Sequence, residues 1–139
     1  MERTLRFRKQ HEEIMLLTGE ISRLLSLEQL SKDCKSVRSL LAKLAGLLNM
    51  HLAAEDNGLY PRLLKDTNKD ISTMAERYIE EMSGLKESFE KYLKKWPSSI
   101  TIKNNPEQFI TDTSQIFTIL KKRIEKENNE LYYIIDRLN

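Results

Sequence analysis

The sequence predicts an all-α protein, an antiparallel up-down-up-down four-helix bundle. Apolar residues recur in alternating steps of three and four along four long segments, which is the pattern of helices packed nearly parallel or antiparallel. The composition agrees, because 139 residues contain only 4 Gly and 3 Pro, with 40% hydrophobic and 32% charged residues. A chain of this length suits one core, so we expect residues 1–139 to form a single domain.

Each predicted helix presents one stripe of core positions. In chain order the stripes are Phe7, His11, Ile14, Thr18, Ile21 and Leu25; Val37, Leu41, Leu44, Leu48, His51, Glu55 and Leu59; Ile71, Ala75, Tyr78, Met82, Leu85, Phe89, Tyr92 and Trp96; and Phe109, Thr113, Ile116, Leu120, Arg123, Glu127, Leu131, Ile134 and Leu138. The second and fourth stripes each contain one extra step of four residues near their ends.

The segments between the stripes carry helix-breaking signals. Residues 26–32 form a polar interruption after the first helix, and Pro61 should kink or end the second helix because it lacks an N–H. Residues 66–70 are rich in capping side chains, and residues 97–105 are the longest expected loop. The fourth helix should begin at Pro106, since proline is favoured in a first helical turn.

Charge and cysteine content exclude several classes of protein. The net charge of +2 is too small to indicate a nucleic-acid partner, and no apolar run approaches the length that spans a membrane. Cys34 is the only cysteine, so the chain has no internal disulfide and suits a reducing compartment. The first 25 residues are too rich in charge for a signal peptide, and we expect a cytoplasmic protein. The sequence identifies no protein partner.

The two histidines indicate where function lies. His11 and His51 both fall on predicted core stripes, and Glu55 follows His51 by one helical turn. A buried histidine and a buried glutamate are costly unless a cation lies between them. That cation is either a metal ion or a positively charged side chain.

An internal repeat brings further residues to the same region. A shift of 72 residues places His51 and Glu55 over Arg123 and Glu127, and a nearly equal shift places His11 over Met82. Two related helical hairpins packed face to face would bring these six residues together in the interior, where bundles build metal sites from glutamate and histidine. The first hairpin supplies three residues suited to bind metal and the second only Glu127, so the site looks half equipped.

At these residues the chain resembles the hemerythrin-like family, the HHE cation-binding domain. The resemblance is carried by residues 7–14, by His51-x-x-x-Glu55 running into Leu59-Tyr60-Pro61, and by residues 123–128. It implies a non-haem di-iron centre in a four-helix bundle, with two bridging carboxylates. Carried over by position, the resemblance gives the metal ligands His11, His51, Glu55 and Glu127. It departs at the residues that would complete the second iron, which here are Tyr78, Met82 and Arg123.

The departures suggest one metal ion instead of two. Met82 is a poor ligand for a hard ion, and Arg123 has no lone pair to donate. We therefore expect one ion, non-haem iron or zinc, unless the site holds none. One hypothesis is that the guanidinium of Arg123 replaces the second metal by bridging Glu55 and Glu127.

Three neighbouring side chains are open questions. Tyr60 and Tyr132 follow the carboxylates in equivalent turns, where each either hydrogen-bonds a ligand or is a core tyrosine with its hydroxyl at the edge. Glu81 lies beside the core stripe and would join the site only by turning inward.

Three functions remain. The first is a metal-binding protein with one iron or zinc, which senses or binds oxygen, peroxide or nitric oxide. The second is a metal-free bundle in which Arg123 pairs with Glu55 and Glu127, acting as an interaction module. The third is a di-iron oxygen-binding protein with unusual ligands. No nucleophile, base and orienting group occur together, so hydrolytic catalysis is not expected.

Overall fold

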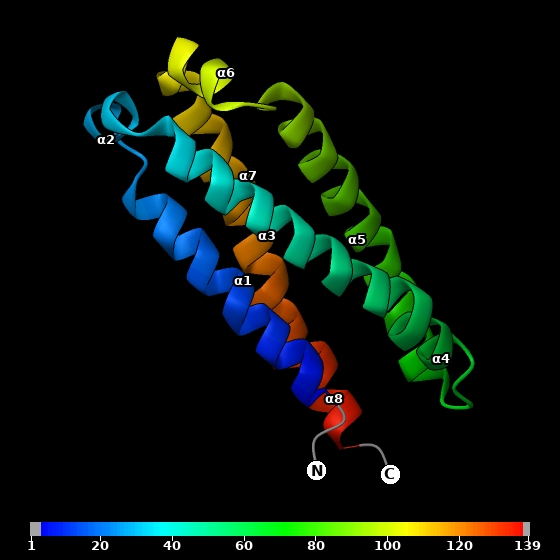
Figure 1. Cartoon of the computed structure of the whole chain (residues 1–139). Coiled ribbons are helices and arrows are strands. Elements are labelled where there is room, and N and C mark those ends of the chain that lie inside the picture. The colour runs from blue at the N-terminus through cyan, green and yellow to red at the C-terminus, as the bar shows by residue number, and fades with distance from the viewer. Residues whose placement is uncertain (1–3, 138–139) are drawn as a thin grey trace.

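The computed structural model describes residues 4–137, apart from the side chains of Met82 and Ser83. This part of the chain is all-helical, as the sequence predicts, and Figure 1 shows the chain turning back between one long helix and the next. The long helices are α1 (Leu5–Arg23), α3 (Cys34–Ala54), α5 (Lys69–Lys95) and α7 (Pro106–Lys126). Among them, α1 packs against α3 and α7, and α5 packs against α7.

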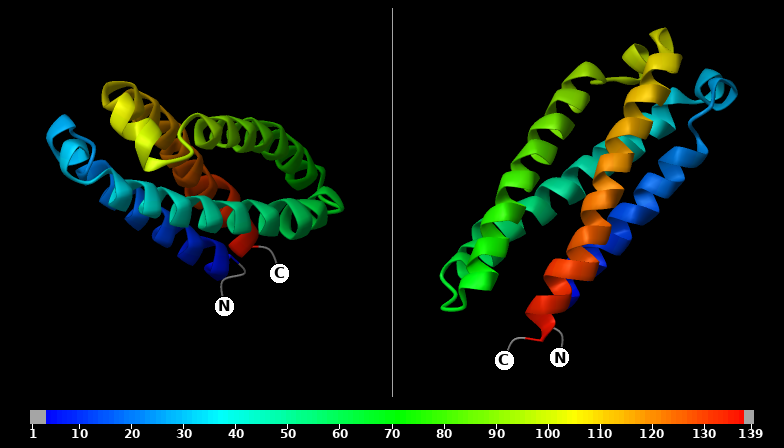
Figure 2. Two further views of the ribbon diagram at one scale, coloured as in Figure 1. Left: turned by 45° about the horizontal axis from the view of Figure 1, so that its top comes forward. Right: turned by 180° about the vertical axis from the view of Figure 1, so that it is seen from behind.

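Short helical pieces join or extend the long ones. They are α2 (Leu27–Lys32), α4 (Tyr60–Leu64), α6 (Ser99–Asn104) and α8 (Tyr132–Asp136), with two π-helical turns, η1 (Glu55–Leu59) and η2 (Glu127–Leu131). The predicted interruption at 26–32 and the predicted loop at 97–105 are thus mostly helical, and α2 and α6 meet at one end of the molecule (Figure 2).

Serine caps explain these two short helices. The Ser26 hydroxyl accepts a hydrogen bond from the backbone N–H of Gln29 at 3.1 Å. Ser98 and Thr101 form a capping box, each side chain accepting from the other's backbone N–H. Such caps satisfy N–H groups that a short helix otherwise leaves unpaired, so polar segments that read as loops fold as single helical turns.

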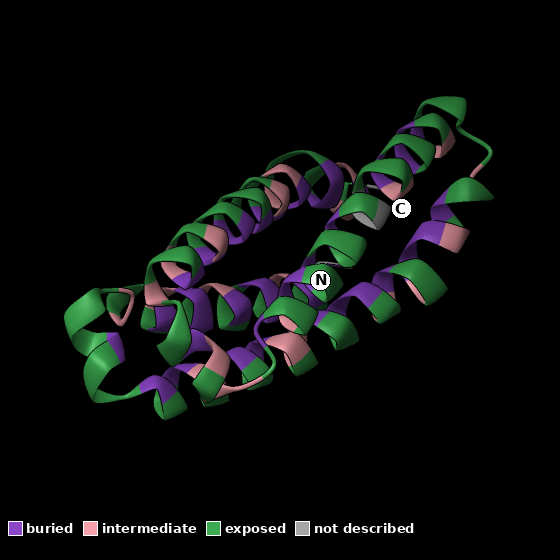
Figure 3. Cartoon of the chain, turned by 90° about the horizontal axis from the view of Figure 1, so that it is seen from above, coloured by how far each residue is buried: buried purple, intermediate pink, exposed green. Residues whose placement is uncertain are grey.

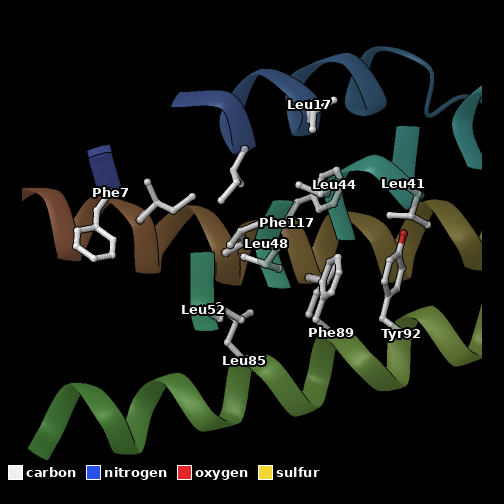
Figure 4. Packing of buried hydrophobic residues seen from close by; sticks show 14 of the residues in the cluster. Phe7, Leu17, Leu41, Leu44, Leu48, Leu52, Leu85, Phe89, Tyr92 and Phe117 are labelled. Atoms are coloured by element: carbon white, nitrogen blue, oxygen red, sulfur yellow. The ribbon is translucent and has the colours of Figure 1, made fainter. Parts of the chain in front are cut away.

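The predicted stripes form the core. Nearly all their described residues are buried, on the faces where the helices meet (Figure 3). Figure 4 shows Leu44 and Leu48 of α3, Phe89 of α5 and Phe117 of α7 meeting in the interior. The exceptions are Leu25, Arg123 and Ile134, which are partly exposed. The side chain of Met82 and residue Leu138, both predicted core positions, lie outside the described part.

The two π-helical turns were not predicted. In each, a tyrosine N–H donates to a carbonyl five residues back: Tyr60 to Glu55, and Tyr132 to Glu127. The helix continues beyond Pro61 into α4 instead of ending there. Proline is not the cause of the widened turn, because η2 forms with Tyr133 at the equivalent position.

The wider turns also explain a shifted core position. One extra residue in the turn rotates the following helix, so Ile135 is buried where the stripe predicted Ile134. The first hairpin has the same arrangement, with Leu63 buried after η1, 72 residues earlier. The 72-residue repeat read in the sequence is therefore present in the backbone.

The described ends of the chain meet beside α8 (Figure 2). The hydroxyl of Thr4 donates to the Asp136 carboxylate at 2.7 Å, and the Thr4 N–H donates to it at 3.1 Å. Within the described residues, every helix is too short or too polar to span a bilayer.

Core packing gives a direct stability prediction. Leu44, with no exposed surface, should lose about 2–5 kcal/mol of unfolding free energy on Leu44→Ala, from lost burial and the cavity left behind. Leu16→Ala on α1 is the matched control, since Leu16 is 65% exposed and should change stability by less than about 0.5 kcal/mol. Urea unfolding in the presence of a chelator measures both; equal losses would contradict the assignment of Leu44 to the core.

Candidate metal centre

Four side chains with metal-ligating groups converge where three helices approach one another. His11 lies in α1, His51 in the last turn of α3, and Glu55 and Glu127 begin η1 and η2. All four are at most 2% exposed. The cluster lies toward the end of the molecule that holds α4, α8 and the two described chain ends (Figure 1).

The inner atoms of these groups are within contact distance. His11 Nε2 lies 2.9 Å from His51 Nε2 and 3.0 Å from Glu127 Oε1. His51 Nε2 lies 3.0 Å from Glu55 Oε1 and 3.8 Å from Glu127 Oε1. The ligand atoms of His11, His51 and Glu127 all lie within 4.8 Å of one another, as a shared cation would require.

The outer nitrogens set the protonation of the two rings. His11 Nδ1 lies 2.8 Å from the side-chain oxygen of Asn128, and His51 Nδ1 lies 2.7 Å from that of Gln10. An amide oxygen only accepts hydrogen bonds, so each Nδ1 carries a hydrogen, and in a neutral ring Nε2 is left with a lone pair. Two lone pairs 2.9 Å apart repel unless a proton or a metal ion lies between them.

One carboxylate oxygen is left without a partner. Among the described residues, Glu55 Oε1 is buried and has no hydrogen bond, because its contact with His51 has the distance but not the alignment of one. A buried acceptor without a partner is destabilising. A cation beside the two Nε2 atoms would satisfy it, so the donor set fits a metal ion.

The outer oxygens of both carboxylates are held by tyrosines. Tyr60 donates its hydroxyl hydrogen to Glu127 Oε2 at 2.9 Å, and Tyr132 donates to Glu55 Oε2 at 2.8 Å. Both tyrosine side chains are buried, so the alternative of hydroxyls at the edge of the core is wrong. Each tyrosine bonds the carboxylate of the other hairpin.

Charges in the cluster are strongly coupled. Burial alone would lower the pKa of His51, but the neighbouring carboxylates of Glu127 and Glu55 outweigh it and raise the pKa to about 9. Burial and the Glu127 charge raise the pKa of Glu55. Burial opposes ionisation of Glu127 too, yet the hydrogen bond with His11 and the nearby His51 hold its pKa below the usual range. Without metal, the cluster therefore holds protons as its cations.

The predicted bridge by Arg123 is wrong. Its guanidinium donates to Glu81 Oε2 at 3.0 Å, and Lys126 contacts the same carboxylate at 3.2 Å. The Glu81 side chain is 37% exposed, so this pairing leaves the charges partly hydrated. A guanidinium between Glu55 and Glu127 would have to lose its water entirely, which is far more costly. Glu81 therefore does not join the cluster.

The other residues of the predicted vacant half are placed only in part. Tyr78 is fully buried, and its hydroxyl lies 3.5 Å from the carbonyl oxygen of Lys126 rather than on a carboxylate. The side chain of Met82 lies outside the described structure.

Sequence reasoning missed two groups of the site. Gln10 and Asn128 were not singled out as site residues, although each adjoins a candidate ligand in the chain. It also missed η1 and η2, both of which start at a ligand carboxylate. The extra four-residue step in the second and fourth stripes was their signal. A π-helical turn contains more residues than an α-helical turn, so successive core positions lie further apart in the sequence.

The fold and this cluster define a helical protein with a metal-type donor set in its interior. The family model of the hemerythrin HHE cation-binding domain matches residues 4–135, so the chain belongs to that family. No curated protein and no solved structure shows a significant match to the chain.

The unequal carboxylates predict opposite effects of one substitution. In metal-free protein at pH 7, Glu55→Gln should leave stability unchanged or raise it, because the raised pKa means that ionised Glu55 is unfavourable. Glu127→Gln should cost about 3–5 kcal/mol, because it removes the charge that pairs with the histidines. Urea unfolding with a chelator tests this; an equal loss in both variants would contradict it.

Proposed function

We propose that this protein binds one divalent metal ion through His11, His51, Glu55 and Glu127. The facing pair of Nε2 atoms, 2.9 Å apart with both Nδ1 atoms on amide oxygens, carries the proposal. Metal-bound histidines commonly have this arrangement, in which the outer N–H is held so that the inner lone pair points at the ion.

The donor set suits iron(II) or zinc. Two imidazoles and two carboxylates are ligands that both ions accept. With Arg123 paired elsewhere, the two carboxylates carry a charge of −2 when ionised, which one divalent ion neutralises. A second divalent ion would leave the buried site with excess positive charge.

We also propose a role for the bound ion, which is to sense or bind a small molecule. Iron would supply an open coordination position for oxygen, peroxide or nitric oxide. The chain's own residues exclude water, hold the rings through Gln10 and Asn128, and keep both carboxylates oriented through tyrosines. A surface pocket of about 360 Å³ is lined in part by Tyr60, which contacts Glu127, and is the route we propose for small molecules.

Other predictions remain proposals of the same kind. We propose one domain over residues 1–139, an up-down-up-down antiparallel bundle and a cytoplasmic location. The alternative function is an interaction module that binds no metal. Arg123 pairs with Glu81, so this alternative no longer includes a bridge from Arg123 to Glu55 and Glu127. A di-iron protein is the second alternative.

Metal content decides between these functions. After anaerobic loading with iron(II) or with zinc, elemental analysis should find one tightly held ion per chain. His51→Ala should abolish retention, because it removes a central donor. Glu81→Ala is the control and should retain the ion, since Glu81 contacts Arg123 and Lys126 outside the cluster. No retained ion under either loading would refute the proposal, and two per chain would support a di-iron centre.

Metal affinity should rise with pH. His51 has a pKa of about 9 without metal, so below that pH the ion must displace its proton. The zinc affinity should therefore increase by at least about tenfold per pH unit between pH 6 and 8, with release of at least one proton. Competition with a chromophoric chelator at pH 6, 7 and 8 measures this. An affinity that does not change with pH would show that His51 does not bind the ion.

A further inference from the structure

The two ligand carboxylates use their oxygens in the same unequal way. In Glu55 and in Glu127, Oε1 faces the histidine pair and Oε2 receives a tyrosine hydroxyl. We propose that Tyr60 and Tyr132 limit each carboxylate to one metal-binding oxygen and so limit the site to one ion. This inference rests on the proposed metal binding.

The Glu127 carboxylate illustrates the division of oxygens. Its Oε1 lies 3.0 Å from His11 Nε2, and its Oε2 accepts from Tyr60 at 2.9 Å. Glu55 matches it, with Oε1 at 3.0 Å from His51 Nε2 and Oε2 accepting from Tyr132 at 2.8 Å. The inner oxygens are therefore available to a cation at the histidine pair, and the outer ones are already occupied.

The repeat shows that this pairing is a property of both hairpins. Each tyrosine directly follows a π-helical turn that begins with a glutamate, and the two tyrosines are 72 residues apart. Neither hydroxyl bonds the carboxylate of its own turn; each bonds that of the other hairpin. The extra residue in a π-helical turn rotates the following tyrosine about the helix axis, compared with its place after an α-turn. Here the rotated tyrosine points toward the opposite hairpin.

Burial makes these hydrogen bonds difficult to exchange. Tyr60 and Tyr132 are at most 1% exposed, so bulk water cannot reach their hydroxyls to replace a lost carboxylate acceptor. A carboxylate only accepts, so the hydroxyl must donate to it. A metal at Oε2 would compete with the O–H for that oxygen's electron density and position, and a buried O–H that loses its acceptor is destabilising.

The same bonds oppose a second ion. A carboxylate that bridges two ions uses one oxygen for each, and one that chelates a single ion uses both. Either mode needs the oxygen that a tyrosine holds. Tyr132 also restricts the space beside His11 in which a second ion could bind. The centroids of the two rings are 5.2 Å apart in a stacked arrangement, and the Tyr132 hydroxyl lies 3.3 Å from His11 Nε2.

Removing the hydroxyls tests the inference. The variant carries Tyr60→Phe and Tyr132→Phe, which keep the rings and their packing. Tyr92→Phe is the matched control, because Tyr92 is also buried and its hydroxyl bonds Thr113 at 2.6 Å, away from the cluster. The probe is zinc, and the readouts are zinc content and the infrared carboxylate bands of ¹³C-glutamate-labelled protein. A carboxylate bound through one oxygen has widely separated stretching bands, and one bound through both has closer bands.

The wild type and Tyr92→Phe should bind one zinc per chain with widely separated bands. In the double variant the bands should move closer, or a second zinc should bind; both results mean that Oε2 has been released to metal. One zinc with unchanged bands in the double variant would overturn the inference. If that variant does not fold, the single variants give the same test at one carboxylate each. Failure of the wild type to retain zinc would instead refute the proposed function.

Discussion

The structure depends on two imidazole nitrogens that face each other in a dry interior. The Nε2 atoms of His11 and His51 face one another at 2.9 Å, and the amide side chains of Gln10 and Asn128 keep both rings in that orientation. Such a pair is unstable without a positive charge beside it, which protons or a metal ion must supply. The carboxylates, the tyrosines and the widened turns are all arranged around that requirement.

The repeated hairpins share backbone geometry but not chemistry. Both contain a glutamate at the start of a π-helical turn and a tyrosine directly after it. The first hairpin adds both histidines, whereas the second has Arg123 at the position equivalent to His51. Because each tyrosine bonds the other hairpin's glutamate, the polar contacts that orient the ligands also join the two halves.

The features that depend on helical periodicity could be predicted from the sequence. The helical class, the core stripes and the burial of His11, His51, Glu55 and Glu127 follow from steps of three and four, and the structure confirms them. Sequence reasoning failed for Arg123, because a stripe position does not tell whether a long side chain reaches inward or to a partner at the edge such as Glu81. It also missed Gln10 and Asn128, since adjacency in the chain does not reveal which amide turns toward a ring.

The cluster also has a consequence for the topology of the chain. The contact between His11 and Glu127 joins residues 116 positions apart, and that between His11 and His51 joins residues 40 apart. A cross-link over such distances removes more freedom from the unfolded chain than one between neighbours. Since Cys34 is the only cysteine, no intrachain disulfide can do this. A cation at the histidine pair would act as a reversible cross-link, which opens when the ion is withdrawn instead of when a bond is reduced.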